Sequence, residues 1–253
     1  MSPLEAQPAT EATAPLTQWQ RIGNTFAAPS KTFRDIKRGN RSWWLPFVVL
    51  ALVGYLFFAA FAYKVGVRQS MANIITMNPK AQEQMAQATP EQRERGMNFW
   101  VVFTEVVSVG GPAFGLLGAV VTSGVLLGTI NFGFGGKANF GEIFAMSYYA
   151  WLPSIVKLLL GTAVMWFQPP EQFNLQNFAP TNAAALFMDP STPHRALYAL
   201  ATHLDIIQIW MAILFGIGLS TVAGVKRSSG YIAVFGWWVL IVLAGVGWAA
   251  AFG

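Results

Sequence analysis

The stretch IFAMSYYAWLPSIVKLLLGTAVMWF, residues 143–167, is the part of the sequence that says most about the fold. A helix needs about 20 mostly apolar residues to cross the hydrocarbon core of a bilayer. This stretch is long enough, and Lys157 is its single charged residue. A proline and a lysine are both unfavourable inside a membrane helix. The stretch therefore predicts a spanning segment in which Pro153 and Lys157 have particular roles.

Four more segments have the same apolar character, at residues 43–66, 99–130, 204–225 and 231–252. Together with the first stretch they predict five membrane spans. The second span is longer than the hydrocarbon core requires, so it has to tilt, kink or protrude. We therefore predict an all-α fold: residues 43–253 form a polytopic membrane bundle of five transmembrane helices.

The composition supports the membrane class and excludes several kinds of site. Of the 253 residues, 54% are hydrophobic and 11% are charged, against about 25% charged in an ordinary soluble domain. The chain has no cysteine, which excludes disulfides and thiolate metal sites, and we expect neither metal nor cofactor. The net charge of +5 is better explained by basic loops that orient a membrane protein than by nucleic-acid binding.

Two segments precede the first span. Residues 1–15 are rich in Pro, Ala, Thr and Glu and predict a disordered tail. Residues 16–42 carry Trp19, Ile22 and Phe26 at helical spacing, and they predict a basic amphipathic segment at the membrane surface. Its bases are expected to contact anionic lipid headgroups, while docking of a partner protein or of a second copy stays open. These bases are Lys31, Arg34, Lys37, Arg38 and Arg41.

The distribution of basic residues predicts the orientation. With five spans, residues 16–42, Lys137 and the pair Lys226-Arg227 fall on the same side of the membrane. By the positive-inside rule this side is cytoplasmic. The amino terminus is then inside and the carboxyl terminus outside, and we expect the bacterial cytoplasmic membrane as the location.

Two short motifs predict helix starts. Thr89 followed by Pro90 combines an N-cap with a proline in the first turn. Asn139-x-x-Glu142 has the spacing of a capping box, in which the two side chains accept hydrogen bonds from each other's backbone amides.

Small residues recur every four positions in the second and fourth spans. Close contact between helices in a membrane relies on such residues, so the two rows predict that these spans are central and packed closely together. The rows comprise Gly111, Gly115 and Ala119 in the second span, and Gly216, Ser220 and Gly224 in the fourth.

Lys157 lies about 15 Å from the outer end of its span at helical rise, which is too deep for its side chain to reach the interface completely. It therefore needs a partner, for which Glu105 is the first choice and Asp205 the second. The three side chains form either an internal ion pair that fixes helix register or a polar cavity or ion path. Pro153 predicts a kink, which is either a hinge or a fixed bend.

At this point the sequence resembles a known family, the Yip-domain proteins, which include bacterial relatives of the Ypt/Rab-interacting proteins of the Golgi. The likeness extends over about residues 20–250. It is carried by residues 26–36 with Trp43-Trp44-Leu45-Pro46, residues 134–140, the tyrosine–proline stretch of the third span, and residues 204–220. The resemblance implies five spans, and it supplies no catalytic residues.

The eukaryotic relatives act in vesicle trafficking and bind prenylated small GTPases through partner complexes. Their DLYGP motif has no clear counterpart in this chain, which puts a GTPase-linked role in doubt. The sequence has no H-E-x-x-H motif, and we expect no enzymatic activity. The preferred interpretation is a membrane-organising or interaction scaffold. A transporter, channel or lipid-moving protein that uses Glu105, Lys157 and Asp205 is the alternative.

Overall fold

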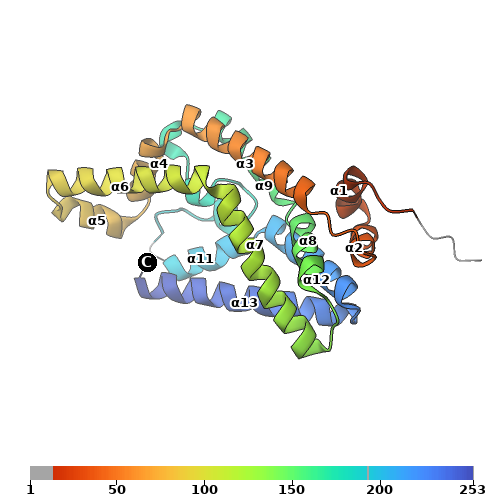
Figure 1. Cartoon of the computed structure of the whole chain (residues 1–253). Helices are drawn as coiled ribbons and strands as arrows, with labels where there is room; N and C mark the ends of the chain where they lie inside the picture. Colours follow the sequence, from red (N-terminus) through yellow and green to blue (C-terminus); the bar gives the residue numbers. More distant parts are fainter. Residues whose placement is uncertain (1–13, 193, 253) are drawn as a thin grey trace, which may run out of the picture.

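The computed structural model describes residues 14–192 and 194–252 and consists of helices joined by loops (Figure 1). Most of the tail expected at residues 1–15 therefore lies outside the described residues. Within them, the only β interaction is an isolated bridge between Asn182 and Asp205. Five helical segments are long and apolar enough to cross a membrane, which confirms the predicted all-α membrane fold. They are Trp44–Lys64, Gly111–Gly133, Phe140–Phe167, Ile206–Ala223 and Arg227–Ala251.

The helices follow one another with short connections. Before the third candidate span they are α1 (Gln18–Ala27), α2 (Pro29–Lys37), α3 (Trp44–Lys64), α4 (Val67–Thr76), α5 (Pro79–Gln87), α6 (Pro90–Val109), α7 (Gly111–Gly128) and the π-helical turn η1 (Thr129–Gly133). From there on they are α8 (Phe140–Ala150), α9 (Ser154–Phe167), η2 (Pro170–Gln172), η3 (Leu175–Asn177), α10 (Ala183–Phe187), α11 (Arg195–His203), α12 (Ile206–Ala223) and α13 (Arg227–Phe252).

Both predicted helix starts are confirmed. The Asn139 side chain accepts a hydrogen bond from the Glu142 amide at 3.1 Å, and the Glu142 carboxylate accepts one from the Asn139 amide at 3.1 Å. Thr89 forms the same reciprocal arrangement with Gln92, and Pro90 is the first residue of α6. These local patterns form because the first amides of a helix have no partner within it.

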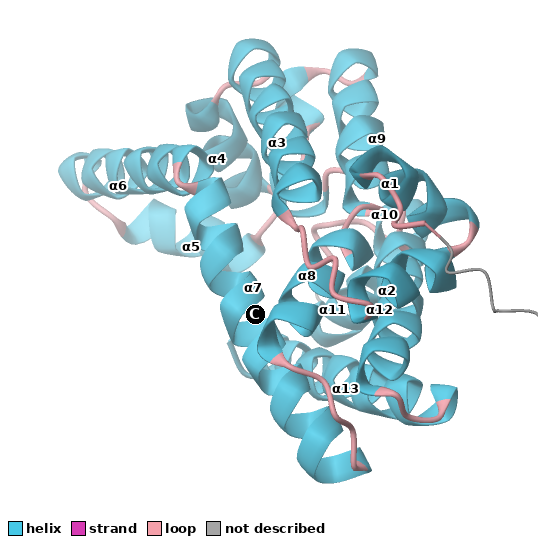
Figure 2. Cartoon of the chain, turned by 45° about the vertical axis from the view of Figure 1, so that its right-hand side comes forward, coloured by secondary structure: helices cyan, strands magenta, loops and turns pink. Residues whose placement is uncertain are grey.

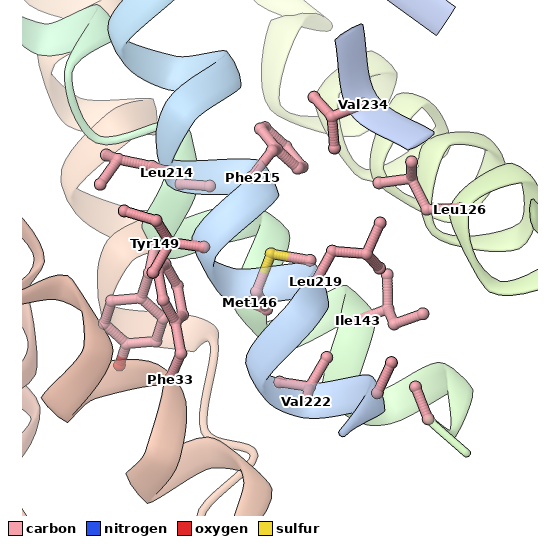
Figure 3. Packing of buried hydrophobic residues seen from close by; sticks show 14 of the residues in the cluster. Phe33, Leu126, Ile143, Met146, Tyr149, Leu214, Phe215, Leu219, Val222 and Val234 are labelled. Atoms are coloured by element: carbon pink, nitrogen blue, oxygen red, sulfur yellow. The ribbon is translucent and has the colours of Figure 1, made fainter. Parts of the chain in front are cut away.

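The core is centred on α12, which packs against α13, α2 and α8. Figure 3 shows side chains from these helices meeting around it. Gly216 allows the ring of Tyr231 on α13 to lie directly against the α12 backbone, since an added Cβ would be 2.2 Å from that ring. The buried side chains include Phe33, Ile143, Met146, Tyr149, Leu214, Leu219, Val222 and Val234.

The predicted pairing of the second and fourth spans is wrong. The helix α7 packs chiefly on α8 and less extensively on α3, whereas α12 has α13 as its main neighbour. Of the row on α7, Ala119 is fully buried next to Phe144 and Tyr148. The row on α12 does mark close packing, but Gly230 on α13 fills the opposing position: an added Cβ there would be 2.3 Å from the Gly216 carbonyl oxygen. Small residues predict that a contact exists and do not specify its partner.

The second candidate span begins at Gly111, later than the predicted residue 99. The helix α6 ends at Val109 and α7 begins two residues later, and the two meet at an angle in Figure 2. Consecutive glycines at 110 and 111, followed by Pro112, explain the break, because these residues weaken a continuous helix. Of the three possibilities for the long segment, the chain adopts the kink.

The third span is also broken, at the predicted position of Pro153. The helix α8 ends at Ala150 and α9 begins at Ser154. The carbonyl of Tyr149, which a proline at this position frees, accepts a hydrogen bond from the Leu152 amide at 3.2 Å. The Ser154 hydroxyl donates to the Trp151 carbonyl at 2.8 Å, so the backbone groups of the break are satisfied within the chain.

The amphipathic segment before the first span packs one of its sides on the protein core. Phe33 and Ile36 on α2 have no exposed surface and belong to the core around α12 and α8. On α1, by contrast, Trp19 and Phe26 remain exposed. The helical spacing was interpreted correctly, but an apolar helix face is equally suited to a protein core and to a lipid surface.

Candidate functional site

The first candidate site is the ion pair between Lys157 on α9 and Asp205, which immediately precedes α12. The Lys157 ammonium lies 2.6 Å from a carboxylate oxygen of Asp205. The Asp205 side chain has no exposed surface and that of Lys157 is 21% exposed. The ammonium also lies 5.7 Å from the centre of the Phe178 ring, within the range of a cation–π contact.

The Asp205 carboxylate accepts four hydrogen bonds from the protein. One oxygen accepts from the backbone amides of Ile207 and Gln208 at 2.8 and 3.2 Å, which caps α12. The other accepts from Lys157 and from the Thr181 hydroxyl, the latter at 2.8 Å. An ionised carboxylate has about four acceptor positions, so protein groups fill the capacity of Asp205.

Asp205 also holds the loop between α9 and α12 in place. Asn182 forms a β-bridge with Asp205, and the Ile206 amide donates to the Thr181 carbonyl at 2.9 Å. Asn182 in turn exchanges side-chain hydrogen bonds with Asn177, at 2.6 and 3.3 Å. The cluster therefore attaches the loop to the start of α12.

Glu105, the first choice as a partner of Lys157, lies elsewhere. It is exposed on α6, whereas Lys157 is paired with Asp205, so that expectation was wrong. The depth of Glu105 was counted from residue 99 along one continuous span, whereas the break at Gly110 turns α6 away from the direction of α7. Sequence reasoning also missed Thr181, since a threonine in a long loop carries no signal for a contact with residue 205.

A second buried pair joins α1 to α2. The Arg21 side chain, 1% exposed, has its Nε 3.6 Å from the Asp35 carboxylate. Its Nη1 donates to the carbonyls of Asn40 and Ser42 at 2.9 and 3.3 Å. The guanidinium also lies over the Tyr149 ring at 5.3 Å. A single arginine among the bases of residues 16–42 gives no signal in the sequence that it is buried.

The basic side chains of α2 and of the residues that follow it are exposed. Basic residues from two other segments of the chain lie close to them. The Arg227 side chain, at the start of α13, donates to the Ser30 hydroxyl at 3.0 Å. The Lys37 ammonium lies at the carboxyl end of α12, 2.8 Å from where a Cβ on Gly224 would be. The Lys137 amide bonds the Ala223 carbonyl at 3.0 Å. We call this surface the basic face; its residues are Lys31, Arg34, Lys37, Arg38, Arg41, Lys137, Lys226 and Arg227.

The acidic groups beside the basic face are buried and already paired. Asp35 pairs with Arg21, and Glu142 lies 3.2 Å from Arg41 while it caps α8. Cations at the carboxyl end of α12 are also favoured by the helix dipole. Within residues 14–192 and 194–252, no three His, Asp or Glu side chains gather as metal ligands would.

The comparison with family models gives a match to the Yip1 domain over residues 23–249. Neither the curated proteins nor the solved structures contain a match to the chain. The matched region runs from within α1 almost to the end of α13. It includes four candidate spans completely and the fifth up to residue 249, the Lys157–Asp205 pair and the whole basic face, whereas Arg21 lies just before it. The chain therefore belongs to the Yip1 domain family of multi-pass integral membrane proteins.

Proposed function

We propose that the protein is a non-enzymatic membrane-organising scaffold that uses its basic face to gather anionic lipid headgroups. The observation that carries this proposal is the firm attachment of α2 to the bundle. Phe33 and Ile36 are buried in the core, and the Arg21–Asp35 pair holds α1 against the same helix. The charges are therefore presented on a rigid support.

The charges of the basic face attract an anionic surface additively. Each Lys or Arg near an anionic membrane surface contributes roughly 1 kcal/mol of attraction. The basic face draws its charges from three parts of the chain, and Asp35 and Glu142 are already committed to internal partners. A partner protein with an acidic surface, or a second copy of the chain, could bind the same charges. The lipid-enrichment experiment distinguishes such protein binding from lipid binding. Nothing in the proposal involves nucleic acid or a cofactor.

The proposed orientation places the basic face in the cytoplasm of a bacterial cell. The positive-inside rule supports this side, and α1, α2 and the start of α13 lie together at one end of the molecule in Figure 1. The end of α13 lies at the other end, together with α4 to α6. The carboxyl terminus would then be outside the cytoplasmic membrane.

The alternative, a transporter, channel or lipid-moving protein, has weaker support. A transport site needs acceptors that an ion or substrate can occupy, and the four hydrogen bonds of Asp205 come from the protein itself. Glu105 does not join the pair. Substitution of Lys157 by Met would abolish a flux of ions or solutes through reconstituted vesicles if this alternative held, and the scaffold proposal expects no such flux in the wild type.

The proposal is tested by measuring which lipids surround the protein. Because the chain has no cysteine, an Ala27→Cys variant can carry one fluorescent donor close to α2. In vesicles that contain acceptor-labelled phosphatidylglycerol or phosphatidylcholine, we expect about twofold or greater enrichment of the anionic lipid, lost at high salt.

The charge reversals Lys31→Glu, Arg34→Glu and Lys37→Glu together should abolish the enrichment. A matched triple reversal at the other end of the bundle, Lys64→Glu, Arg93→Glu and Arg95→Glu, should not. Equal energy transfer to both lipids in the wild type would contradict the proposal. Cross-linking of Ala27→Cys to an acidic protein in native membranes, without lipid enrichment, would favour the docking alternative.

A further inference from the structure

A groove on the membrane-spanning part of the bundle has no assigned ligand. It encloses about 500 Å³ between α3, α7 and the broken helix α8–α9, which is within the range of about 300–1,000 Å³ typical of small-molecule sites. Three candidate spans line it, so it faces the hydrocarbon core. Lipid tails are as apolar as the groove itself, so either a lipid chain or another helix fills such a groove in a bilayer.

The floor of the groove is formed by small residues of α7. Gly111, Gly115 and Gly118 line it, and an added Cβ at any of the three would meet no atom within 4 Å. The opposite wall is aromatic and aliphatic, with Phe47 and Phe58 of α3 among its side chains. Gly111 and Gly115, which were expected to pack against the fourth span, thus leave an open channel.

The two ends of the groove carry tyrosines with different bonding. Near one end the Tyr55 hydroxyl donates to the Val109 carbonyl at 2.8 Å. Near the other, the hydroxyl of Tyr148 is buried and has no hydrogen-bond partner among the described residues. A buried hydroxyl without a partner is unfavourable, the more so in a membrane. An acceptor from a bound molecule would satisfy it.

The Tyr148 end lies at the level of the membrane interface. Its ring is stacked on Trp43, at the very start of α3, with 5.4 Å between ring centres. Tryptophans at the end of a span mark the headgroup level. Two residues before Trp43, Arg41 bonds Glu142 at the start of α8, and its side chain remains 49% exposed. Tyr148 is six residues further along α8 than Glu142, about 9 Å at helical rise.

We propose that the groove binds one anionic glycerophospholipid. An acyl chain lies along Gly111, Gly115 and Gly118, an ester carbonyl accepts a hydrogen bond from Tyr148, and the phosphate meets Arg41. Glu142 engages only part of the Arg41 guanidinium, which has five N–H donors, so donors remain for a phosphate. The Arg41 charge and the unpaired Tyr148 hydroxyl at one end of the groove favour a complete phospholipid over an acyl chain without a headgroup.

The test is a titration of detergent-solubilised, delipidated protein, followed by native mass spectrometry. The probes are phosphatidylglycerol and phosphatidylcholine with identical chains. We expect one phosphatidylglycerol to bind about tenfold more tightly than phosphatidylcholine. Both lipids carry the phosphate, but the choline ammonium of phosphatidylcholine offsets its attraction to Arg41. Gly115→Leu, which fills the groove, should weaken this binding at least tenfold. Gly124→Leu is the matched control, because it lies on the same helix outside the groove and has equal room for a side chain.

Tyr148→Phe preserves the shape of the groove and should weaken phosphatidylglycerol binding by about tenfold without loss of the fold, because the removed hydroxyl has no protein partner. Unchanged binding by Gly115→Leu, or equal binding of both lipids by the wild type, would overturn the proposal. It would also be overturned if a Gly118→Cys variant formed disulfide-linked dimers in membranes regardless of added lipid, since a second copy would then occupy the groove.

Discussion

The Arg21–Asp35 pair and the Lys157–Asp205 pair both fasten a segment outside the spans to the bundle. The first lies with α2, which packs toward the carboxyl end of α12, and the second lies at the amino end of α12. They differ in how completely their groups are satisfied. Asp205 accepts four hydrogen bonds, and its contact with Lys157 is 2.6 Å. The Arg21 Nε is 3.6 Å from Asp35 and has no hydrogen-bond partner among the described residues.

This difference in hydrogen bonding predicts how firmly each pair holds its segment. All four acceptor positions of the Asp205 carboxylate are filled, and the carboxylate also caps α12. Any other position of this side chain would lose several of these bonds, so Asp205 holds the start of α12 in one arrangement. The Arg21 end relies on stacking over Tyr149 and on two carbonyl acceptors, and its ionic contact is longer. The basic face is on this end, where the buried Phe33 and Ile36 hold α2 to the core even though the ion pair is less completely satisfied.

The largest expected effect is that of Asp205→Ala. It removes the cap of α12 and leaves the partly buried Lys157 without its counter-ion; breaking a fully buried pair costs about 3–5 kcal/mol, and because Lys157 is 21% exposed we expect a loss of about 3 kcal/mol. Unfolding in detergent–denaturant mixtures, followed by tryptophan fluorescence, measures the change. The double variant Lys157→Met with Asp205→Asn should recover part of the loss, because no unpaired charge remains and Asn still caps helices. A loss below about 1 kcal/mol for Asp205→Ala would remove the contrast between the two ends.

Arg21→Met is expected to have the second largest effect, about 2 kcal/mol, because it leaves the Asp35 carboxylate with weaker compensation. Asp35 retains hydrogen bonds from the Leu16 amide and the Asn40 side chain, both at 3.1 Å. The loosening should be local to α1 and α2. Hydrogen exchange should therefore increase in residues 16–42 and remain unchanged in α12; equal increases in both would show that the ends are coupled.

Thr181→Val tests whether saturation itself matters. The variant removes one of the four hydrogen bonds to Asp205 and keeps the ion pair, so a loss of about 1 kcal/mol is expected. The same unfolding measurement checks it. Asn40→Leu is the parallel change at the other end, since it removes one hydrogen bond to Asp35. A larger effect for Thr181→Val than for Asp205→Ala is the outcome that would contradict the ranking.

The smallest effect is expected at an exposed pair, Arg68–Glu94, which serves as a reference for both buried ones. Hydrogen bonding and the positive charge of Arg68 lower the pKa of Glu94. A carboxyl group with a lowered folded-state pKa stabilises the protein above its unfolded value of about 4.3 and loses that contribution as the pH falls through the folded value. Glu94→Gln should therefore make the melting temperature fall slightly less steeply with decreasing pH below about pH 4.3. At pH 7 the melting temperature should change only as much as the loss of a surface ion pair predicts. A steep change at neutral pH would show that the surface pair matters as much as the buried ones.

Local patterns predicted much of the fold. The length of the apolar segments was enough to predict five spans, and the spacing of Asn139 and Glu142 was enough to predict a helix cap. Both predictions depend only on residues that are close together in the sequence. The family resemblance expected over about residues 20–250 was confirmed by the family match over residues 23–249. The break at Pro153 was likewise predicted from one residue and its missing amide.

The candidate site was predicted less well. Lys157 and Asp205 were both singled out, yet Glu105 was preferred as the partner because the angle at Gly110 could not be known. The row at Gly111 and Gly115 was assigned to a helix contact, and it lines a groove instead. In each case a local chemical need was identified correctly, and the group that meets it depends on how distant segments are placed.

The sequence by itself determined that this chain is a five-span helical membrane protein with a basic amino-terminal segment, since hydrophobic length and charge are properties of short windows. Only the tertiary structure decided that α2 packs against α12, that Asp205 pairs with Lys157, and that α7 leaves a groove against α3. These outcomes depend on packing between residues up to two hundred positions apart, such as Ser30 and Arg227, and no window of sequence contains that information.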